Sequence, residues 1–387
     1  MAAIPHIALL IETSREYARG VLRGIAQYHH EHGPWSIYLA PHGLDEPPPS
    51  WLKDWDGDGI LCRINSKRMA EAVLATKIPF VDLRGAIPDA RLPFVGLDNR
   101  PIARLGYDHL LQCGLRTFAF CGSPRGENPP QDLRCDYFVE LVESGGQKCE
   151  VFLGQTIRGR KYSWEREQEK LAIWIKRLQK PVGVMASNDD RGHQVLDACR
   201  RAGVNVPDDV AVIGVDNDAN LCNLCTPPLS SIDTNPGRVG YEAAALLMRM
   251  IGGEKSPREP VLLRIPRGLV RRQSTDVLAV DDPGVVKALR YIREHACEGI
   301  RVSDVISQTQ HSPSTLDRRI KALLGRSVKS EITRVRLERV KLLLQESDLK
   351  ITEIAGRTGF AESKYLCQVF NASEGMTPTS YRKQFRD

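Results

Sequence analysis

The C-terminal quarter of this 387-residue chain carries one spaced set of apolar residues and glycine twice. The first copy consists of Val302, Val305, Ile306, Leu316, Ile320 and Gly325. The second copy lies 49 to 50 residues later and consists of Ile351, Ile354, Ala355, Leu366, Phe370 and Gly375. In each copy the spacing predicts a short amphipathic helix, a turn and a second helix. Such a duplication restricts the region to an all-α fold with two related halves.

Two short helices joined by a turn are typical of a DNA-binding helix-turn-helix, whose second helix lies in the major groove. Gly359 supplies the positive φ that ends a helix, and Ser312 with Pro313 forms a helix start in the first copy. One copy alone fits an ordinary helical hairpin equally well. Between the copies, residues 327–345 predict a helix of about 27 Å. Because successive major-groove faces lie roughly 34 Å apart, the duplication on this spacer favours DNA.

The candidate DNA contacts are the residues on the outer faces of the two second helices. Leu316, Ile320 and Leu323 are expected to face inward. The outward candidates are Ser314, Asp317, Arg318 and Lys321 in the first copy and Ser363, Lys364, Cys367 and Gln368 in the second. Arg318 can bind a guanine and Gln368 an adenine, each through two hydrogen bonds. The flanking Arg319 and Arg326 are expected to meet phosphate or only to solvate the surface.

The charge distribution supports a nucleic-acid partner for the same region. Residues 283–387 contain 19 Lys and Arg against 12 Asp and Glu, whereas the preceding 282 residues contain 35 against 36. The whole positive excess of the chain therefore lies in the segment with the duplicated motif. A basic face of this kind releases counterions from phosphate and supplies affinity that does not depend on base sequence. A basic surface that only meets solvent is the alternative.

Other classes of protein find less support. No stretch of 18 apolar residues and no signal-peptide pattern is present, so we expect a cytoplasmic protein without a membrane span. The ten cysteines follow no disulfide framework, and the lone CxxC of Cys222 and Cys225 lacks the second pair of a zinc site. No phosphate-binding glycine loop and no GxSxG elbow occurs. We therefore expect no enzyme activity, no metal and no cofactor.

The first 280 residues alternate apolar strands with helical segments. Nine strand-like runs, from HIALLIE near the N-terminus to VAVIGVD near residue 215, are separated for the most part by amphipathic helices. Strands that are apolar throughout indicate parallel sheets buried on both faces. So many strand and helix units predict two doubly wound lobes.

Polar residues that directly follow strands are the candidate ligand contacts, because doubly wound sheets bind ligands at the carboxyl ends of their strands. The candidates are Glu12, Asp82, Arg134, Asn188, Asp189 and Asp216, with Ser14 and Arg84 beside them. Carboxylates, an amide and an arginine can hold neighbouring hydroxyl groups through charge-assisted hydrogen bonds. The set therefore predicts a polyol or sugar site. Each residue could instead cap a helix or lie on the surface, Asp189 in particular.

The run from Gly299 to Phe385 resembles the DNA-binding domain of AraC/XylS transcription factors. The resemblance rests on IxEIA at 351–355, GF at 359–360, Phe370, Gly375 and TPxxYR at 377–382. The first copy departs from that family, since Ile306 stands where Ala is usual and Gln310 where Gly is usual. These departures place the base contacts of the first copy in doubt.

Residues 6–274 resemble the sensor domain of LacI/GalR regulators, through segments such as GLDNRPIARLGYDHLLQCG, SNDDRGHQVLDACRRAG and SSIDTNPGRVGYEAAALL. The resemblance assigns sugar contacts to Asp82, Arg134, Asn188 with Asp189, and Asp216. The N-terminal DNA reader usual in that family is absent. A sugar sensor ahead of an AraC-type reader is similar to the regulators of xylose operons.

Together these features predict a two-lobed α/β sensor of the periplasmic-binding-protein type (type I), followed by an all-α domain with two helix-turn-helix motifs. The expected bounds are 1–276 for the sensor, 277–284 for a linker and 285–387 for the reader. The implied partners are operator or promoter DNA, a small sugar (a pentose such as xylose) and a second copy of the chain, and RNA polymerase is compatible with this arrangement. A transport receptor for sugars is the alternative, but it leaves the basic C-terminal region without a role.

Overall fold

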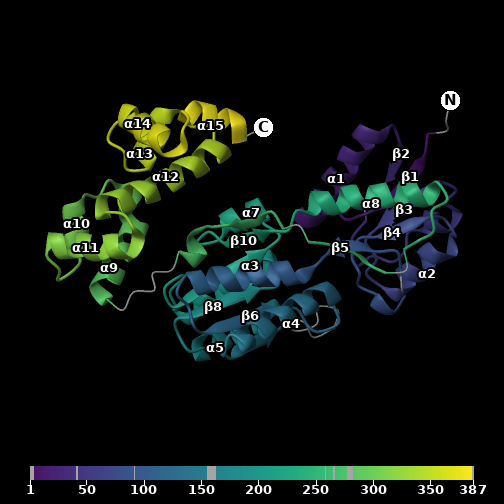
Figure 1. Cartoon of the computed structure of the whole chain (residues 1–387), viewed down its shortest axis with the longest axis horizontal. Helices are drawn as coiled ribbons and strands as arrows, with labels where there is room; N and C mark the ends of the chain where they lie inside the picture. Colours follow the sequence, from purple (N-terminus) through teal and green to yellow (C-terminus); the bar gives the residue numbers. More distant parts are fainter. Residues whose placement is uncertain are drawn as a thin grey trace. The chain divides into compact units, whose positions relative to one another are not determined.

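The computed structural model describes residues 4–40, 42–90, 92–154, 163–257, 259–264, 266–276 and 282–385. The chain divides into two compact units, Met1–Val277 and Leu278–Asp387. The first unit holds the strands β1–β12 and the helices α1–α8, and the second holds α9–α15 (Figure 1). The two-lobed α/β sensor and the all-α reader predicted from the sequence are confirmed.

The N-terminal lobe of the sensor is built on a parallel sheet of four strands in the order β2-β1-β3-β4. Its strands are β1 (His6–Leu10), β2 (Ser36–Leu39), β3 (Gly59–Cys62) and β4 (Phe80–Asp82). Its helices are α1 (Glu16–His32), α2 (Lys67–Ala75) and α8 (Pro236–Ile251). The strand β2 lies at the edge of the sheet and is exposed along its length, which departs from the expectation that strands are buried on both faces.

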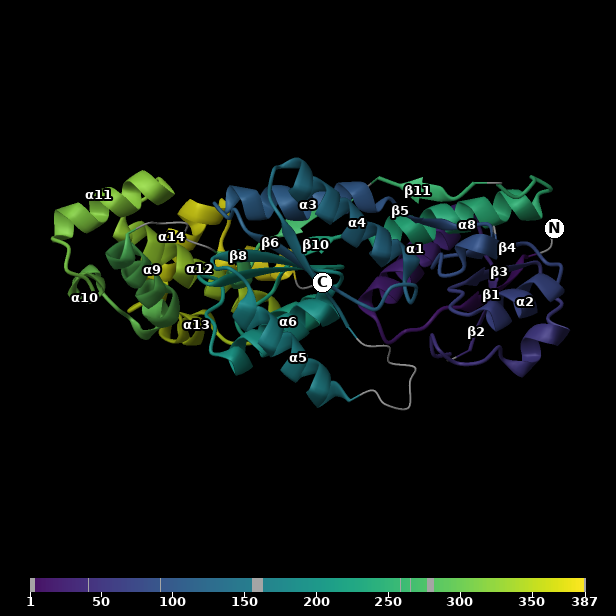
Figure 2. The same cartoon turned by 90° about the horizontal axis from the view of Figure 1, so that it is seen from below.

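Helices α1 and α8 lie side by side in this lobe although more than 200 residues separate them (Figures 1 and 2). Glycine permits this close approach. A Cβ on Gly24 would lie 1.7 Å from the carbonyl oxygen of Gly237, and one on Gly240 would lie 2.0 Å from that of Val21. Any side chain at these positions would force the helices apart, so the pairing depends on both glycines.

The second lobe is built on six strands in the order β12-β10-β9-β8-β6-β7, parallel except for the antiparallel pair β10–β12. Its strands are β6 (Phe118–Gly122), β7 (Cys149–Leu153), β8 (Val182–Ala186), β9 (Val210–Val215), β10 (Ser230–Asp233) and β12 (Gly268–Val270). Its helices are α3 (Asn99–Gln112), α4 (Pro129–Ser144), α5 (Trp164–Arg177), α6 (Asp189–Ala202) and α7 (Ala219–Leu224).

The central strands of this lobe are apolar throughout because helices cover both of their faces. Phe118 and Phe120 of β6 pack with α3 and α4, whereas Ala119 and Cys121 of the same strand pack with α5 and α6. Figure 2 shows α3 on one side of β6, β8 and β10 and α5 and α6 on the other. The parallel, doubly wound arrangement predicted from these runs is therefore observed.

Three segments connect the two lobes. The chain passes from β5 (Val95–Leu97) into α3, from β10 into α8, and from β11 (Val261–Leu263) into β12. Strands β5 and β11 pair in parallel with each other, Val95 opposite Val261 and Leu97 opposite Leu263. The short strands β10, β11 and β12 were not expected from the sequence. They bring segments from both ends of the sensor to the junction of the lobes.

The reader unit consists of two helical clusters joined by one long helix. Its helices are α9 (Pro283–His295), α10 (Val302–Ser307), α11 (Pro313–Leu324), α12 (Val328–Glu346), α13 (Ile351–Arg357), α14 (Ser363–Glu374) and α15 (Pro378–Phe385). Leu316 and Ile320 of α11 are fully buried in the first cluster, as Leu366 and Phe370 of α14 are in the second. The two helix-turn-helix motifs and their spacer thus match the repeat read from the sequence.

Some details of the reader differ from the expectation. Leu323, expected to face inward, is 38% exposed, and Leu324 packs against the core instead. Gly359 has the expected positive φ of 74°, but Gln310 at the matching place in the first copy does not. Helix α9 begins at Pro283, inside the range expected for the linker, and Asp282 caps it. Residues 277–281 of that range lie outside the described residues.

Candidate functional site

A cavity of about 130 Å³ lies between the two lobes of the sensor. Four of the predicted ligand contacts line it, namely Arg134, Asn188, Asp189 and Asp216. They come from four separate elements of the second lobe: α4, the end of β8, α6 and the end of β9. Residues of the first lobe, among them Ser14, Tyr17, Arg63 and Arg84, close the opposite wall. A ligand in this cavity would therefore touch both lobes.

Arg134 is held in place by groups that leave part of its guanidinium facing the cavity. Its Nε donates to Oδ1 of Asn99 at 2.9 Å, and Nη1 donates to the carbonyl oxygen of Ser187. The residue is buried, and loss of solvent lowers the pKa of Arg134, while the charge of Asp216 opposes this shift. The result is a fixed cation beside a carboxylate, which suits adjacent hydroxyl groups.

Asp216 ends β9 in an unusual backbone conformation. Its φ is +102°, and that of Asn217 is +51°. Residues other than glycine rarely adopt such values, and they concentrate at functional sites where the surrounding structure holds them. Thr234 donates to Oδ1 of Asp216 at 3.3 Å. Burial raises the pKa of Asp216, although Arg134 favours its charged form.

Asp189 faces the interior at the start of α6. Its Oδ1 accepts from the Ser231 hydroxyl at 2.5 Å, and its Oδ2 accepts from the Asp218 amide at 2.7 Å. Burial, with the neighbouring charge of Asp216, raises the pKa of Asp189 to about 8. Near neutral pH this carboxyl is mostly protonated, so it can donate a hydrogen bond to a ligand oxygen. The helix cap that Asp189 could have formed is made by Asn188, whose Oδ1 accepts from the Arg191 amide at 2.9 Å.

The other two predicted contacts, Glu12 and Asp82, are buried but do not line this cavity. Glu12 is paired with Arg63, which lines the cavity and lies over the Tyr17 ring. The carboxylate of Asp82 accepts the backbone amides of Ile64, Arg84 and Gly85 at 2.9–3.0 Å. Both residues therefore hold the wall of the cavity rather than form it. Burial nevertheless raises the pKa of Asp82.

Several cavity residues were missed by the sequence argument. Asn99 directly follows Asp98, the residue after β5, so the rule used for the other residues would have found it. Tyr17 carries no such signal, since it reads as an ordinary residue of an amphipathic helix. Burial raises the pKa of Tyr17 to about 12, so its hydroxyl stays neutral. Phe94 adds an apolar wall to the cavity.

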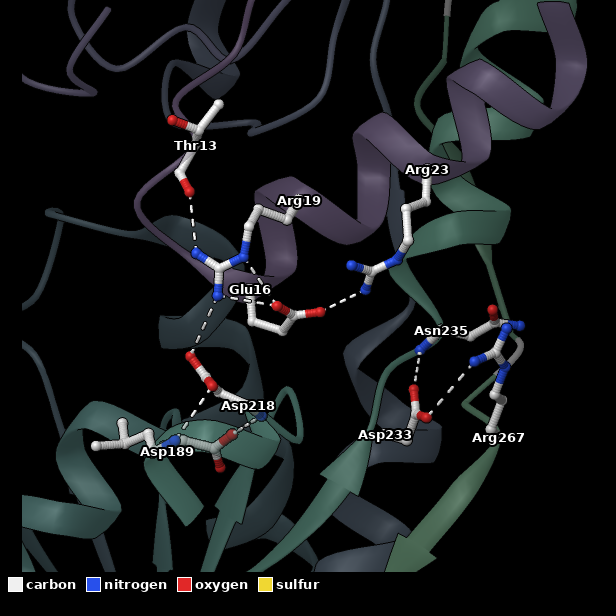
Figure 3. Close-up of polar contacts among 10 residues, drawn as sticks. Thr13, Glu16, Arg19, Arg23, Asp189, Asp218, Asp233, Asn235 and Arg267 are labelled. Atoms are coloured by element: carbon white, nitrogen blue, oxygen red, sulfur yellow. Dashed lines mark hydrogen bonds and ion pairs between the residues drawn. The ribbon is translucent and has the colours of Figure 1, made fainter. Parts of the chain in front are cut away.

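An ion pair joins the lobes beside the cavity. Figure 3 shows Arg19 of α1 between Glu16 of its own lobe and Asp218 of the other lobe. Arg19 Nη2 lies 3.9 Å from Asp218 Oδ2, and the Asp218 amide bonds to Asp189. A charge at the surface of one lobe is thus one residue away from a cavity carboxyl of the other.

Neither a metal site nor a redox pair emerges in the described part of the chain. No group of three or more His, Cys, Asp or Glu side chains there is arranged to hold a metal ion. Cys222 and Cys225 are both buried, and burial raises the pKa of both thiols. Thiols of this kind are unreactive and pack as small apolar groups.

In the reader, the predicted outer face of α11 is partly exposed. Ser314, Arg318 and Lys321 are exposed. Asp317 is half-buried, and its Oδ1 accepts the Val328 amide at 2.9 Å, which ties α11 to the start of α12. The prediction that Asp317 faces outward is therefore only partly met, because its carboxylate is used within the fold.

The outer face of α14 also differs from the expectation. Lys364 and Gln368 are exposed, Ser363 is half-buried, and Cys367 packs against the apolar cluster of the second motif. Tyr365 was missed, and it is 46% exposed on the same helix. Cys367 reads as polar in sequence, but its size allows it to fill the edge of a core.

The flanking arginines have partners inside the reader. Arg319 pairs with Asp282, the cap of α9. Arg326 Nε donates to the buried Glu331 at 2.5 Å, and Arg334 binds the same carboxylate. Burial disfavours the charge of Glu331, but the two arginines together lower its pKa. Arg326, expected to meet phosphate or solvent, thus anchors the start of α12.

Comparison with known proteins covers both units. Models of a XylR N-terminal domain, a periplasmic binding protein-like domain and a helix-turn-helix domain match residues 6–99, 107–275 and 306–384. The xylose operon regulatory proteins of Haemophilus influenzae and Escherichia coli K12 are each 30% identical over 97% of this chain, and the matches span 97% and 96% of their lengths. No helix in the described part of the chain is long and apolar enough to cross a membrane.

Solved structures agree with these matches. A structure of the xylose-binding transcription activator xylR is 28% identical, covers all of both chains and has a TM-score of 0.79. A periplasmic-binding-protein/LacI regulator from Alkaliphilus metalliredigens, solved with D-xylulofuranose, is 20% identical, covers 70% of this chain and 98% of that chain, and has a TM-score of 0.55. The latter match shows the fold of the sensor alone. The resemblances drawn from the sequence are confirmed for both units.

Proposed function

The chain belongs to the family of AraC-type transcription regulators with a XylR-type sugar-sensing domain, which are not enzymes, and we propose that its effector is a pentose, with xylose as the first candidate. The observation that carries the proposal is the convergence of Arg134, Asp189 and Asp216 on one small cavity. A cavity of this volume holds on the order of ten water-sized spheres, which suits a monosaccharide better than a larger ligand.

The proposed roles follow from the protonation states of the cavity groups. Asp216 is paired with the cation of Arg134 and serves as the acceptor for sugar hydroxyls. Asp189, with its pKa of about 8, serves as a donor. The second guanidinium nitrogen of Arg134 donates to a ring or hydroxyl oxygen. Alternating donors and acceptors at fixed positions select among stereoisomers, since a misplaced hydroxyl leaves a buried polar group unpaired.

We propose that the sugar acts by favouring closure of the two lobes. Polar groups reach the cavity from both lobes, so a ligand that bridges them stabilises the closed arrangement more than the open one. Closure of this hinged kind is a common switch in two-lobed binding domains. Because β12 and the last residues of the sensor belong to the second lobe, rotation of that lobe moves the point from which the chain continues to the reader.

For the reader, we propose that α11 and α14 enter successive major grooves of an operator. The exposed Arg318 and Gln368 are assigned to base edges, and the exposed Lys321 and Lys364 to base or phosphate. The long helix α12 fixes the two motifs to one spacing. We further propose that two copies of the chain act as a homodimer, each reading one half of the operator.

One experiment separates this function from that of a transport receptor. Operator sequences are selected from random duplexes by the full-length protein. Affinity for the selected duplex is then measured by fluorescence anisotropy with and without D-xylose, L-arabinose, D-ribose and D-glucose. The proposal expects a selected sequence motif and a change in its affinity with a pentose but not with glucose. Sugar binding without any selected motif would indicate a receptor, and a motif whose affinity no pentose changes would remove the pentose.

A further inference from the structure

A second cavity of about 240 Å³ adjoins the sugar cavity and is mainly apolar. Ile87, Leu92 and Phe94 of the first lobe form one side, and Leu133 and Tyr137 of α4 form the other. Pro88, Pro129, Pro130, Pro260 and Leu262 complete its apolar lining. It thus spans the same two lobes as the sugar cavity, and one of its walls is the helix that carries Arg134.

The two cavities share part of their walls. Phe94, Leu97, Asn99 and Pro130 line both. The Phe94 ring has a prepared seat, because a Cβ on Gly96 would lie 2.2 Å from the tip of the ring and a Cβ on Gly85 would lie 2.8 Å from it. Any other residue at either position would push the ring away. The ring therefore presents an apolar surface to both cavities from one fixed place.

The polar groups of the second cavity are already engaged within the protein. The carboxylate of Asp82 accepts three backbone amides, and that of Asp98 accepts from the Arg100 amide and from Arg264. Oδ1 of Asn99 accepts from Arg134. No buried charge there awaits a charged or highly polar ligand, and the remaining lining is hydrocarbon. The chemistry of the cavity therefore favours an apolar group.

Two leucines at the cavity are left partly in water. Leu133 is 46% exposed and Leu262 is 50% exposed, although both belong to the apolar lining. An apolar group bound here would remove part of this surface from water, which is favourable in proportion to the area covered. It would also add contacts between lobes that the sugar is proposed to bring together.

We propose that this second cavity binds a small aromatic or aliphatic group, carried as the aglycone of a glycoside whose sugar occupies the adjoining polar cavity. The inference rests on the proposed sugar function for the position of the glycosyl part. A free aromatic molecule has the same chemistry and is a second source of the group. An aryl glycoside fills both cavities at once, with Phe94 as the wall between sugar and aglycone.

The test compares affinities by calorimetry for D-xylose, methyl xyloside, phenyl xyloside (both anomers) and xylobiose, whose second unit is polar. The variants are Leu133→Gln and Leu262→Gln, and the matched control is Leu74→Gln, a leucine 48% exposed on α2 away from both cavities. One phenyl anomer is expected to bind the wild type at least about tenfold more tightly than its methyl counterpart, about 1.4 kcal/mol. Xylobiose is expected to show no such gain. The gain should fall in both cavity variants and persist in the control, with D-xylose affinity the same in all.

The outcomes separate this inference from the sugar function. Equal affinity of phenyl and methyl xylosides while D-xylose binds would overturn the inference and leave the sugar function intact. The same holds if Leu133→Gln and Leu262→Gln keep the full gain. Benzyl alcohol, tested alone and with saturating xylose, distinguishes the sources: binding that Leu133→Gln abolishes supports the same cavity with a free aromatic ligand. Absence of binding by every sugar, xyloside and benzyl alcohol would overturn both proposals.

Discussion

Arg19 and Asp218 form an ion pair that crosses from one lobe of the sensor to the other, with Nη2 and Oδ2 3.9 Å apart. Arg19 is also bound by Glu16 and by the carbonyl oxygen of Thr13, so its guanidinium is held at the edge of its lobe (Figure 3). The amide of Asp218 in turn donates to Asp189 in the cavity. Lobe contact and the protonated cavity carboxyl therefore meet at a single residue, which several predictions can probe.

Asp218→Asn should weaken sugar binding only modestly. The amide oxygen can still cap α7 as Asp218 does toward the Leu221 amide, but the charge opposite Arg19 is lost. A half-exposed ion pair of this kind contributes about 0.2–1 kcal/mol, so affinity should fall by no more than about fivefold. The loss should shrink as salt screens the pair. Calorimetry at low and high salt checks this, with Asp197→Asn, which breaks pairs within one helix, as the control that should show no change.

Asp216→Asn should reduce the affinity for the effector sharply while the fold persists. Asparagine tolerates a positive φ better than most residues, so the backbone at +102° is retained and only the charge is removed. Loss of a charged acceptor costs about 1.5–3 kcal/mol per hydrogen bond, which is about tenfold or more in affinity. Thermal shift and calorimetry with the effector measure the change, and Asp136→Asn on the surface of α4 serves as the control. Unchanged affinity would remove Asp216 from the site.

Stability of the free sensor should decline with pH because of Asp189. Its pKa rises from 3.8 to about 8 on folding, so between these values the folded protein holds a proton that the unfolded chain has released. The stabilisation is complete below about pH 4 and is lost as pH rises toward 8, with a slope of at most about 1.4 kcal/mol per unit. Urea unfolding from about pH 5 to 8 should show a shallower slope for Asp189→Asn. Asp197→Asn, whose parent carboxyl has a lowered pKa, should keep the wild-type slope over this range.

Arg318→Ala and Gln368→Ala should relax base preference at two separate segments of the operator. Each residue is exposed on the second helix of its own motif, and a bidentate base contact discriminates by about 1–3 kcal/mol. Binding-site selection on the wild type and both variants locates the lost information. Lys287→Ala on α9 is the control and should leave the motif unchanged. Loss at the same base pairs in both variants, or at none, would mean that the motifs do not read separate grooves.

A fragment of residues 281–387 should fold and bind the selected operator without any response to sugar. It retains Asp282, whose carboxylate accepts the Gly284 and Val285 amides at the start of α9 and also pairs with His311 and Arg319. Asp282→Ala should lower the Tm of the fragment, since loss of a cap alone costs about 0.5–2 kcal/mol. Circular dichroism and anisotropy measure folding and binding. An insoluble fragment, or one that responds to sugar, would contradict the proposed division of the chain.

Sequence patterns alone determined the order and type of most elements and the division of function between the two units. The runs around β6, β8 and β9 had to be apolar because helices cover both faces of the sheet, and such runs are visible without coordinates. The repeated positions of α11 and α14 were equally visible, because each buried residue recurs with the period of a helix. The match to known regulators rests on the same local features.

Tertiary structure decided which polar side chains reach the ligand. Asp82 and Asp216 both follow a buried strand, yet Asp82 turns to three backbone amides and Asp216 lines the cavity. The direction of a side chain after a strand depends on the loop that follows, and that loop packs against residues distant in sequence. Tyr17, Phe94 and the inter-lobe pair of Arg19 with Asp218 were unpredictable for the same reason: each owes its position to an element that only folding brings near.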